Sequence, residues 1–135
     1  MNRKQFRSTA LATALACVGL VTTAQPAQAS SFYGCPSGYA CLYTDNTDTL
    51  GATHPHTDYF YYGYYNLSNV IGNHYLVNNQ TGGARVYPCY GYNGTNCTVP
   101  MTGPNGGTIY YLPAGYDVNL NFTPINSLKL CASAC

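Results

Sequence analysis

After residue 30, short apolar runs rich in tyrosine alternate with clusters of glycine, asparagine and proline. Runs of this length between turn-forming residues predict short β-strands, and no segment has a convincing helical pattern. The expected strands are residues 39–44, 59–66, 75–78, 84–88, 107–112, 117–122 and 126–130. Short strands at this spacing are typical of an all-β sandwich or barrel of antiparallel sheets.

The second half of the chain repeats part of the pattern of the first half. Leu42-Tyr43 matches Val86-Tyr87 at an offset of 44 residues, and residues 73–77 match residues 126–130 at an offset of 53. The larger second offset indicates extra residues, which we place around residues 97–107. Two repeats of four strands predict paired Greek keys around one shared core. The alternative is that such short matches arise by chance in a chain so rich in tyrosine and asparagine.

The first 29 residues have the features of a secretion signal peptide. Three basic residues near the start precede an apolar stretch, and Ala27-Gln28-Ala29 supplies a small-x-small cleavage site. We therefore expect a secreted, extracellular protein whose single mature domain, residues 30–135, begins at Ser30. A membrane anchor is the rival interpretation, but the apolar stretch is too short and too rich in alanine and threonine.

The mature chain is expected to carry little charge. It has two basic residues, Arg85 and Lys129, and four aspartates, so its net charge is −2. Binding of nucleic acid or of an anionic membrane requires basic residues, so neither is an expected partner. The chain has no glutamate, no G-x-S-x-G and no H-E-x-x-H, so we expect a protein that is not an enzyme. A small hydrolase stays open as an alternative, because catalytic triads are recognised by geometry.

Six cysteines lie in the mature chain, in three pairs close in sequence. An even number of cysteines in a small exported protein predicts a disulfide framework. Proximity favours sequential pairing, that is Cys35 with Cys41, Cys89 with Cys97, and Cys131 with Cys135. A zinc site is disfavoured, because no pair has C-x2-C spacing.

The segment closed by the second pair is the candidate binding loop. Its candidate residues are Cys89, Tyr90, Gly91, Tyr92, Asn93, Gly94 and Cys97. A rigid, uncharged loop with a disulfide at its base loses little entropy on binding, and tyrosines supply contact area at low entropic cost. Such a loop can enter a protease cleft as a substrate-like segment. The alternative interpretation is a hairpin tip that is cross-linked for stability alone.

An unusual aromatic run occupies residues 59–65. In one continuous strand, Phe60, Tyr62 and Tyr64 would lie on one face, and Tyr59, Tyr61 and Tyr65 on the other. One set is expected in the core, and the other could stack on sugar rings or on a protein. The alternative is that these rings only pair across a sheet.

Metal binding has two weak candidates. His54-Pro55-His56 with Asp58, joined by His74, contains metal-ligating residue types, but histidines in a polar turn are usually solvent-exposed. Residues 45–49 approach the calcium motif of βγ-crystallins, but Leu50 replaces its final serine and few carboxylates are present. We therefore expect no metal and no other cofactor.

Three motifs carry a resemblance to a known family. Residues 35–43, Cys-Pro-Ser-Gly-Tyr-Ala-Cys-Leu-Tyr, are similar to the opening of small secreted actinobacterial proteins grouped with the streptomycete metalloproteinase inhibitor. Residues 79–84 and 124–128 also resemble this peptidase-inhibitor family. The chain departs from the family pattern in its tyrosine-rich stretch before Asn66 and in its C-terminal cysteine pair.

The resemblance implies a βγ-crystallin-like double Greek-key sandwich. It also implies a secreted protein that inhibits an extracellular endopeptidase. We further expect a monomer, with the Cys89–Cys97 loop as its main contact. The alternative function is a non-catalytic extracellular module that recognises cell-wall polysaccharide or a partner protein through exposed tyrosines.

Overall fold

A computed structural model describes residues 31–45 and 50–135, and all regular structure in these residues is β. The strands are β1 (Ala40–Tyr43), β2 (His56–Tyr59), β3 (Gly63–Asn66), β4 (Asn73–Asn78), β5 (Arg85–Cys89), β6 (Met101–Thr102), β7 (Thr108–Ile109), β8 (Leu112–Pro113), β9 (Tyr116–Asn121) and β10 (Ser127–Cys131). The predicted all-β class is confirmed. None of the described residues belongs to a helix long and apolar enough to cross a membrane.

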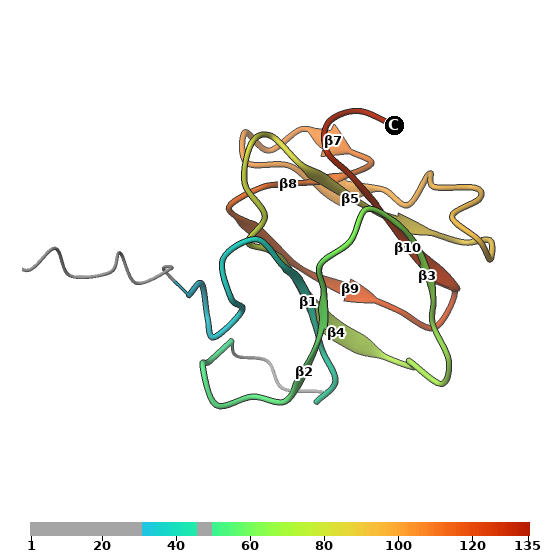
Figure 1. Ribbon diagram of the computed structural model, residues 1–135. Coiled ribbons are helices and arrows are strands. Elements are labelled where there is room, and N and C mark those ends of the chain that lie inside the picture. The colour runs from blue at the N-terminus through green and yellow to red at the C-terminus, as the bar shows by residue number, and fades with distance from the viewer. Residues whose placement is uncertain (1–30, 46–49) are drawn as a thin grey trace, which may run out of the picture.

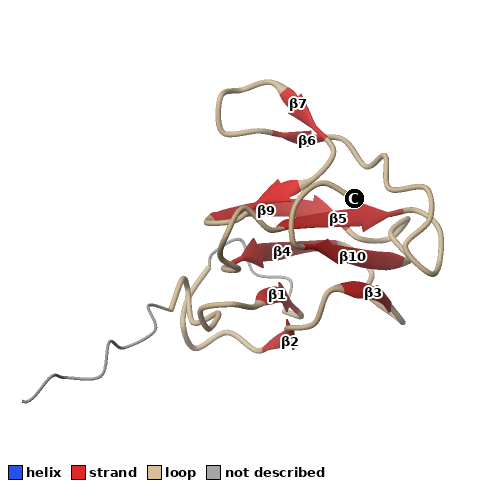
Figure 2. Cartoon of the chain, turned by 45° about the horizontal axis from the view of Figure 1, so that its top comes forward, coloured by secondary structure: helices blue, strands red, loops and turns tan. Residues whose placement is uncertain are grey.

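Eight strands form two four-stranded antiparallel sheets, which Figures 1 and 2 show from two sides. The first sheet has the order β2-β1-β4-β9, and the second has the order β3-β10-β5-β8. Each half of the chain therefore contributes three strands to one sheet and one strand to the other. The exchanged strands are β3, which pairs with β10, and β9, which pairs with β4.

The strands that carry the sequence repeat occupy equivalent places. β1 and β5 each lie second from one edge of their sheets, and β4 and β10 are their inner neighbours. The connection from β1 to β2 spans residues 44–55, whereas the connection from β5 to β8 spans residues 90–111. The longer connection contains the β6–β7 hairpin, which Figure 2 shows standing apart from the sheets. The extra residues of the second half thus lie in this connection, which includes the region around residues 97–107 that the larger repeat offset predicts.

The main core lies between the two sheets. It contains apolar side chains from both, and its buried members are Ala40, Leu42, Leu67, Leu76, Val86, Val99, Leu112, Phe122, Ile125, Leu128 and Leu130. Alternate side chains of a strand point to opposite faces, so Cys41 and Tyr43 of β1 point away from this core. They form a second buried cluster with Cys35 and Val77, against which Phe32 and Tyr39 pack. Both faces of β1 are therefore covered, which explains why all four of its residues are buried.

The prediction of a single strand over residues 59–66 is wrong. The chain ends β2 at Tyr59, bends through residues 60–62 and begins β3 at Gly63, so the two strands belong to different sheets. Gly63 has a φ of 134°, a conformation that side-chain-bearing residues rarely adopt. A local pattern cannot reveal this crossing, because every residue of the run has high strand propensity. The expected strand over residues 107–112 is likewise divided, into β7 and β8.

The three disulfides join the cysteines that are neighbours in sequence: Cys35–Cys41, Cys89–Cys97 and Cys131–Cys135. Cys41 lies in β1, so the first disulfide fastens the N-terminal segment to the outer face of the first sheet. Cys89 ends β5, so the second closes the loop that follows this strand. Three disulfides indicate an oxidising environment.

Candidate functional site

The loop from Cys89 to Cys97, hereafter the stapled hairpin, folds back on itself. The Tyr90 amide donates to the Asn96 carbonyl oxygen at 3.1 Å, and the Gly91 amide donates to Thr95 at 3.0 Å. At the tip, Asn93 and Gly94 have φ values of 56° and 67°. Two consecutive positive φ values at Asn-Gly are the mark of a type I′ turn, the tightest common hairpin connection. The turn signal in the sequence is therefore realised in the structure.

Side chains from two other strands hold this hairpin in place. Buried Ser127, at the start of β10, donates from Oγ to the Gly91 carbonyl oxygen at 2.6 Å and accepts from the Gly94 amide at 3.1 Å. Asn66, at the end of β3, accepts from the Asn93 amide at 2.7 Å and donates to the Asn93 side chain at 2.9 Å. The first arm and the tip are thus held by hydrogen bonds, in addition to the disulfide at the base.

A further anchor comes from Asn126, whose side-chain amide donates to the Tyr90 carbonyl oxygen at 2.6 Å. The sequence did not predict that these three residues hold the hairpin. Asn66 lies 27 residues from Asn93, and Ser127 lies 33 and 36 residues from Gly94 and Gly91. No local pattern carries that information. Asn126 and Ser127 belong to a motif of the family resemblance, and this is the one signal that pointed to them.

The two tyrosines of the hairpin have different environments. Tyr90 is half-buried and packs against the main core, whereas Tyr92 is 57% exposed. Tyr92 therefore presents its ring to a partner and Tyr90 does not, which corrects the expectation that both rings offer contact area. The hairpin contains no charged residue.

Beside Tyr92 lies a surface hollow of about 220 Å³. Residues 67–71 form its opposite wall, and Thr123, Ile125 and Asn126 also line it. Ile71 on this wall is 66% exposed and adds an apolar side chain to the lining of the hollow. The hairpin tip and this wall together make an uncharged contact surface with two apolar projections.

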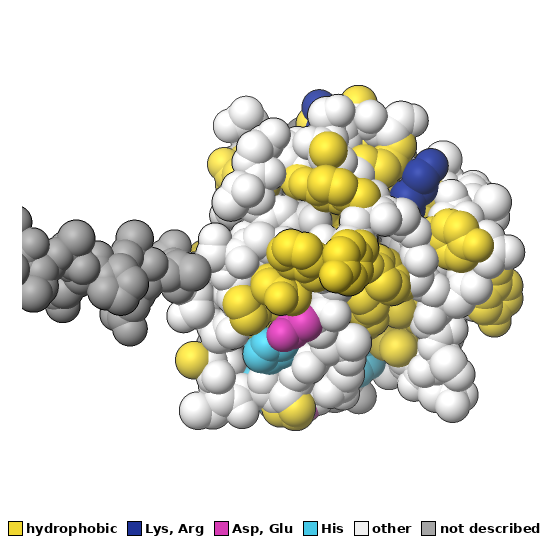
Figure 3. All heavy atoms as spheres, in the orientation of Figure 1, with side chains coloured by type: hydrophobic (Ala, Val, Ile, Leu, Met, Phe, Trp, Pro, Cys, Tyr) yellow, Lys and Arg dark blue, Asp and Glu magenta, His cyan; other side chains and the backbone are white. Residues whose placement is uncertain are grey.

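The aromatic bend between β2 and β3 forms a second candidate surface. Phe60, Tyr61 and Tyr62 line a hollow of about 340 Å³ together with Gly38 and Thr81. Figure 3 shows hydrophobic side chains gathered in a band across this face, over the segment that links β2 to β3. The expected division into a core face and an exposed face is largely observed: Phe60, Tyr62 and Tyr64 are exposed, whereas Tyr59 and Tyr65 pack against the main core. Tyr61 is the exception, because the bend leaves it exposed.

The histidines pair with carboxylates near the first sheet. His54 Nδ1 pairs with Asp45 Oδ2, and His56 Nε2 lies 3.1 Å from Asp58 Oδ1. His56 Nδ1 donates to the His54 carbonyl oxygen at 3.0 Å, so both of its ring nitrogens have partners. His74 does not join them, because it is buried against Phe122 and donates from Nε2 to the Ile71 carbonyl oxygen.

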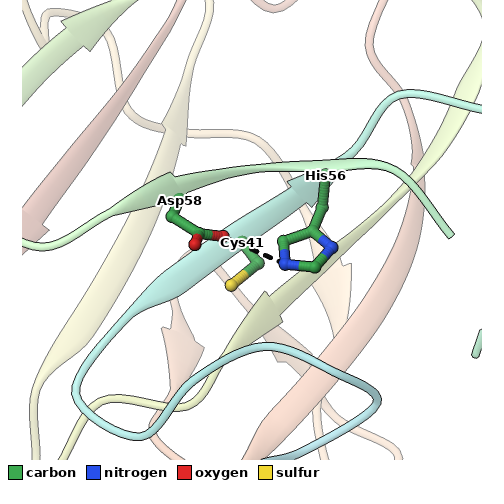
Figure 4. A group of neighbouring side chains, drawn as sticks. All are labelled: Cys41, His56 and Asp58. Carbon is green, nitrogen blue, oxygen red and sulfur yellow. Dashed lines mark ion pairs between the residues drawn. The ribbon is translucent and has the colours of Figure 1, made fainter. Parts of the chain in front are cut away.

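Cys41, His56 and Asp58 come close enough together to resemble a metal site (Figure 4). The Cys41 sulfur, however, is bonded to Cys35 and is not available as a thiolate. The arrangement therefore offers a histidine and a carboxylate that already pair with each other. The calcium-like motif cannot be compared with the structure, because residues 46–49 lie outside the described residues.

Burial shifts the pKa values of two ionisable groups, one in β1 and one in β9. Burial raises the pKa of the Tyr43 hydroxyl, and the charge of Asp58 raises it further. Burial likewise raises the pKa of the Asp117 carboxyl group. Neither group lies in the stapled hairpin or in the aromatic hollow.

The chain matches no protein-family model, no curated protein and no solved structure.

Proposed function

We propose that this protein is a secreted inhibitor of an extracellular endopeptidase, with the stapled hairpin as its main contact. The observation that carries the proposal is that the tip is exposed and uncharged, yet the hairpin is held by a disulfide at its base and by hydrogen bonds from Asn66 and Ser127 to its first arm and tip. A loop that is already ordered before binding loses little conformational entropy when it enters a cleft. The resemblance to the metalloproteinase-inhibitor family points to the same activity.

The tip conformation suggests how the hairpin blocks a cleft. Asn93 and Gly94 have positive φ values, whereas an extended peptide requires strongly negative ones. The tip therefore enters as a folded wedge rather than as the substrate-like segment expected from the sequence. Tyr92 is the exposed aromatic anchor, and Ile71 adds a second apolar contact from the neighbouring wall.

The proposal includes the finer assignment of fold and location. The exchange of β3 and β9 between the sheets supports paired Greek keys of the βγ-crystallin-like kind. The three disulfides and the signal-like leader support secretion of residues 30–135. The proposal also takes this domain to be a monomer that is not an enzyme.

The test is incubation of the purified mature protein with metallo-, serine and cysteine endopeptidases, following both their activity and cleavage of the protein. We expect stoichiometric inhibition of at least one of them. Replacing Tyr92 with alanine should weaken that inhibition by about 2 kcal/mol, as loss of a central aromatic anchor does. Tyr110→Ala is the matched control, because Tyr110 is 50% exposed and lies outside the hairpin. Full activity of every protease at excess protein would refute the proposal.

A further inference from the structure

The aromatic hollow has a defined shape. We call Phe60, Tyr61 and Tyr62 with Gly38 and Thr81 the aromatic corner. The rings of Phe60 and Tyr61 lie 5.2 Å apart and at 85° to each other, so they form two walls rather than a flat platform. Tyr61 is the most exposed large hydrophobic side chain among the described residues, at 76%. The hollow of about 340 Å³ is at the lower end of the size range of small-ligand sites.

Contacts behind the rings hold the corner in shape. Tyr39 packs against Phe60 with ring centroids 4.9 Å apart. The Tyr65 hydroxyl donates to the Tyr61 carbonyl oxygen at 2.8 Å and fixes the backbone of the bend. The bend joins β2 to β3, which are edge strands of different sheets, so both of its ends are fixed by strand pairing. The Phe60 ring and the backbone of the bend are therefore held in place, which lowers the ordering cost of binding.

The chemistry of the corner restricts the ligand. No charged side chain lines it. The hydroxyl groups of Thr81, Tyr61 and Tyr62 make no hydrogen bond to any of the described residues. Aromatic faces are electron-rich and attract polarised C–H groups. The fitting ligand is neutral, has C–H groups on a face and carries hydroxyls around its edge, and a pyranose ring has all three properties.

We propose that the aromatic corner is a binding site for a neutral polysaccharide. Because its rings are perpendicular, the corner accepts a sugar unit of a single chain, with one ring against the sugar face and the other against its edge. A crystalline polysaccharide surface would require coplanar rings. The corner shares no lining residue with the hollow beside the stapled hairpin, so sugar binding is independent of the proposed inhibition.

The test is isothermal titration with cellohexaose, laminarihexaose and chitohexaose, and with oligogalacturonate as a charged counterpart. We expect one binding site for at least one neutral hexasaccharide, no binding of the polyanion, and an affinity that is insensitive to salt because no ion pair forms. Tyr61→Ala should lower the affinity about tenfold or more, as loss of an aromatic anchor does. The Tyr61 carbonyl group stays in this variant, so the bend keeps its hydrogen bond.

Two further variants separate stacking from loss of structure. Tyr61→Phe keeps the ring and should stay within about threefold of the parent, and Tyr110→Ala should bind like the parent. The proposal is overturned if none of the three neutral hexasaccharides binds, or if Tyr61→Ala binds as well as the parent. It is also overturned if sedimentation shows a dimer that Tyr61→Ala dissociates, because a second copy would then occupy the corner.

Discussion

Ser127 provides the sharpest test of how the stapled hairpin is held. Its side chain is fully buried beneath the hairpin, and its hydroxyl bridges Gly91 on one arm to Gly94 at the tip. Replacing Ser127 with alanine removes both hydrogen bonds and changes the volume little. The Gly91 carbonyl and the Gly94 amide then lose their partner where the hairpin packs on β10.

The expected cost follows from these two bonds. Each contributes about 1 kcal/mol net, and a polar group left without a partner in a buried place costs about 1–3 kcal/mol. We therefore expect Ser127→Ala to lower the free energy of unfolding by about 2–4 kcal/mol. That is a large fraction of the roughly 5–15 kcal/mol by which most domains are stable. The Cys89–Cys97 disulfide is unaffected, so the hairpin base stays closed.

Urea unfolding with intact disulfides, followed by far-ultraviolet circular dichroism, measures this change. The midpoint should fall while the m-value stays constant. Ser133→Ala is the control, because Ser133 is exposed near the C-terminus and its replacement should change stability by less than about 0.5 kcal/mol. Hydrogen exchange gives a local measurement: the Gly94 amide should exchange faster in Ser127→Ala than in the parent.

The same variant links structure to the proposed function. If the hairpin inhibits because it is preordered, Ser127→Ala should also weaken inhibition, since ordering must then occur on binding. An unfolding free energy within about 0.5 kcal/mol of the parent, with unchanged exchange at Gly94, would refute the bridging role of Ser127.

Three other outcomes are expected. Gly94→Ala should destabilise the protein by about 1–3 kcal/mol in thermal or urea unfolding, because Gly94 has a positive φ and an added Cβ would lie 3.1 Å from Tyr64 Cβ. Gly82→Ala, at a φ of 69° with open space around it, should cost less, and an equal cost would contradict the close packing. Asp117→Asn should raise the free energy of unfolding at neutral pH. Burial raises the folded-state pKa of Asp117 above 3.8, so the contribution of Asp117 to stability is favourable below pH 3.8 and is lost as pH rises through the folded-state pKa. Unfolding at several pH values checks this, and equal pH dependence of parent and variant would contradict it. The secreted protein should begin at Ser30 and gain six hydrogens on reduction, measured by intact mass; a smaller gain would mean a free thiol.

Much of the fold follows from local patterns in the sequence. The strands near residues 39–44, 75–78, 84–88, 117–122 and 126–130 were predicted close to their observed bounds, because their apolar residues alternate between short turn clusters. The disulfide pairing followed from proximity along the chain. Asn93-Gly94 predicted a turn because few other dipeptides tolerate positive φ at both positions. Each of these features depends on residues within one segment.

The tertiary structure decided everything that depends on contacts between segments. Propensity favours one strand through the aromatic run, yet the exchange of β3 into the second sheet divides it and leaves Phe60, Tyr61 and Tyr62 exposed at the bend. Tyr90 and Tyr92 are equivalent in the sequence, but only Tyr90 meets the core. Local sequence specifies where a chain can extend or turn, whereas burial and partnership depend on which distant segments pack together.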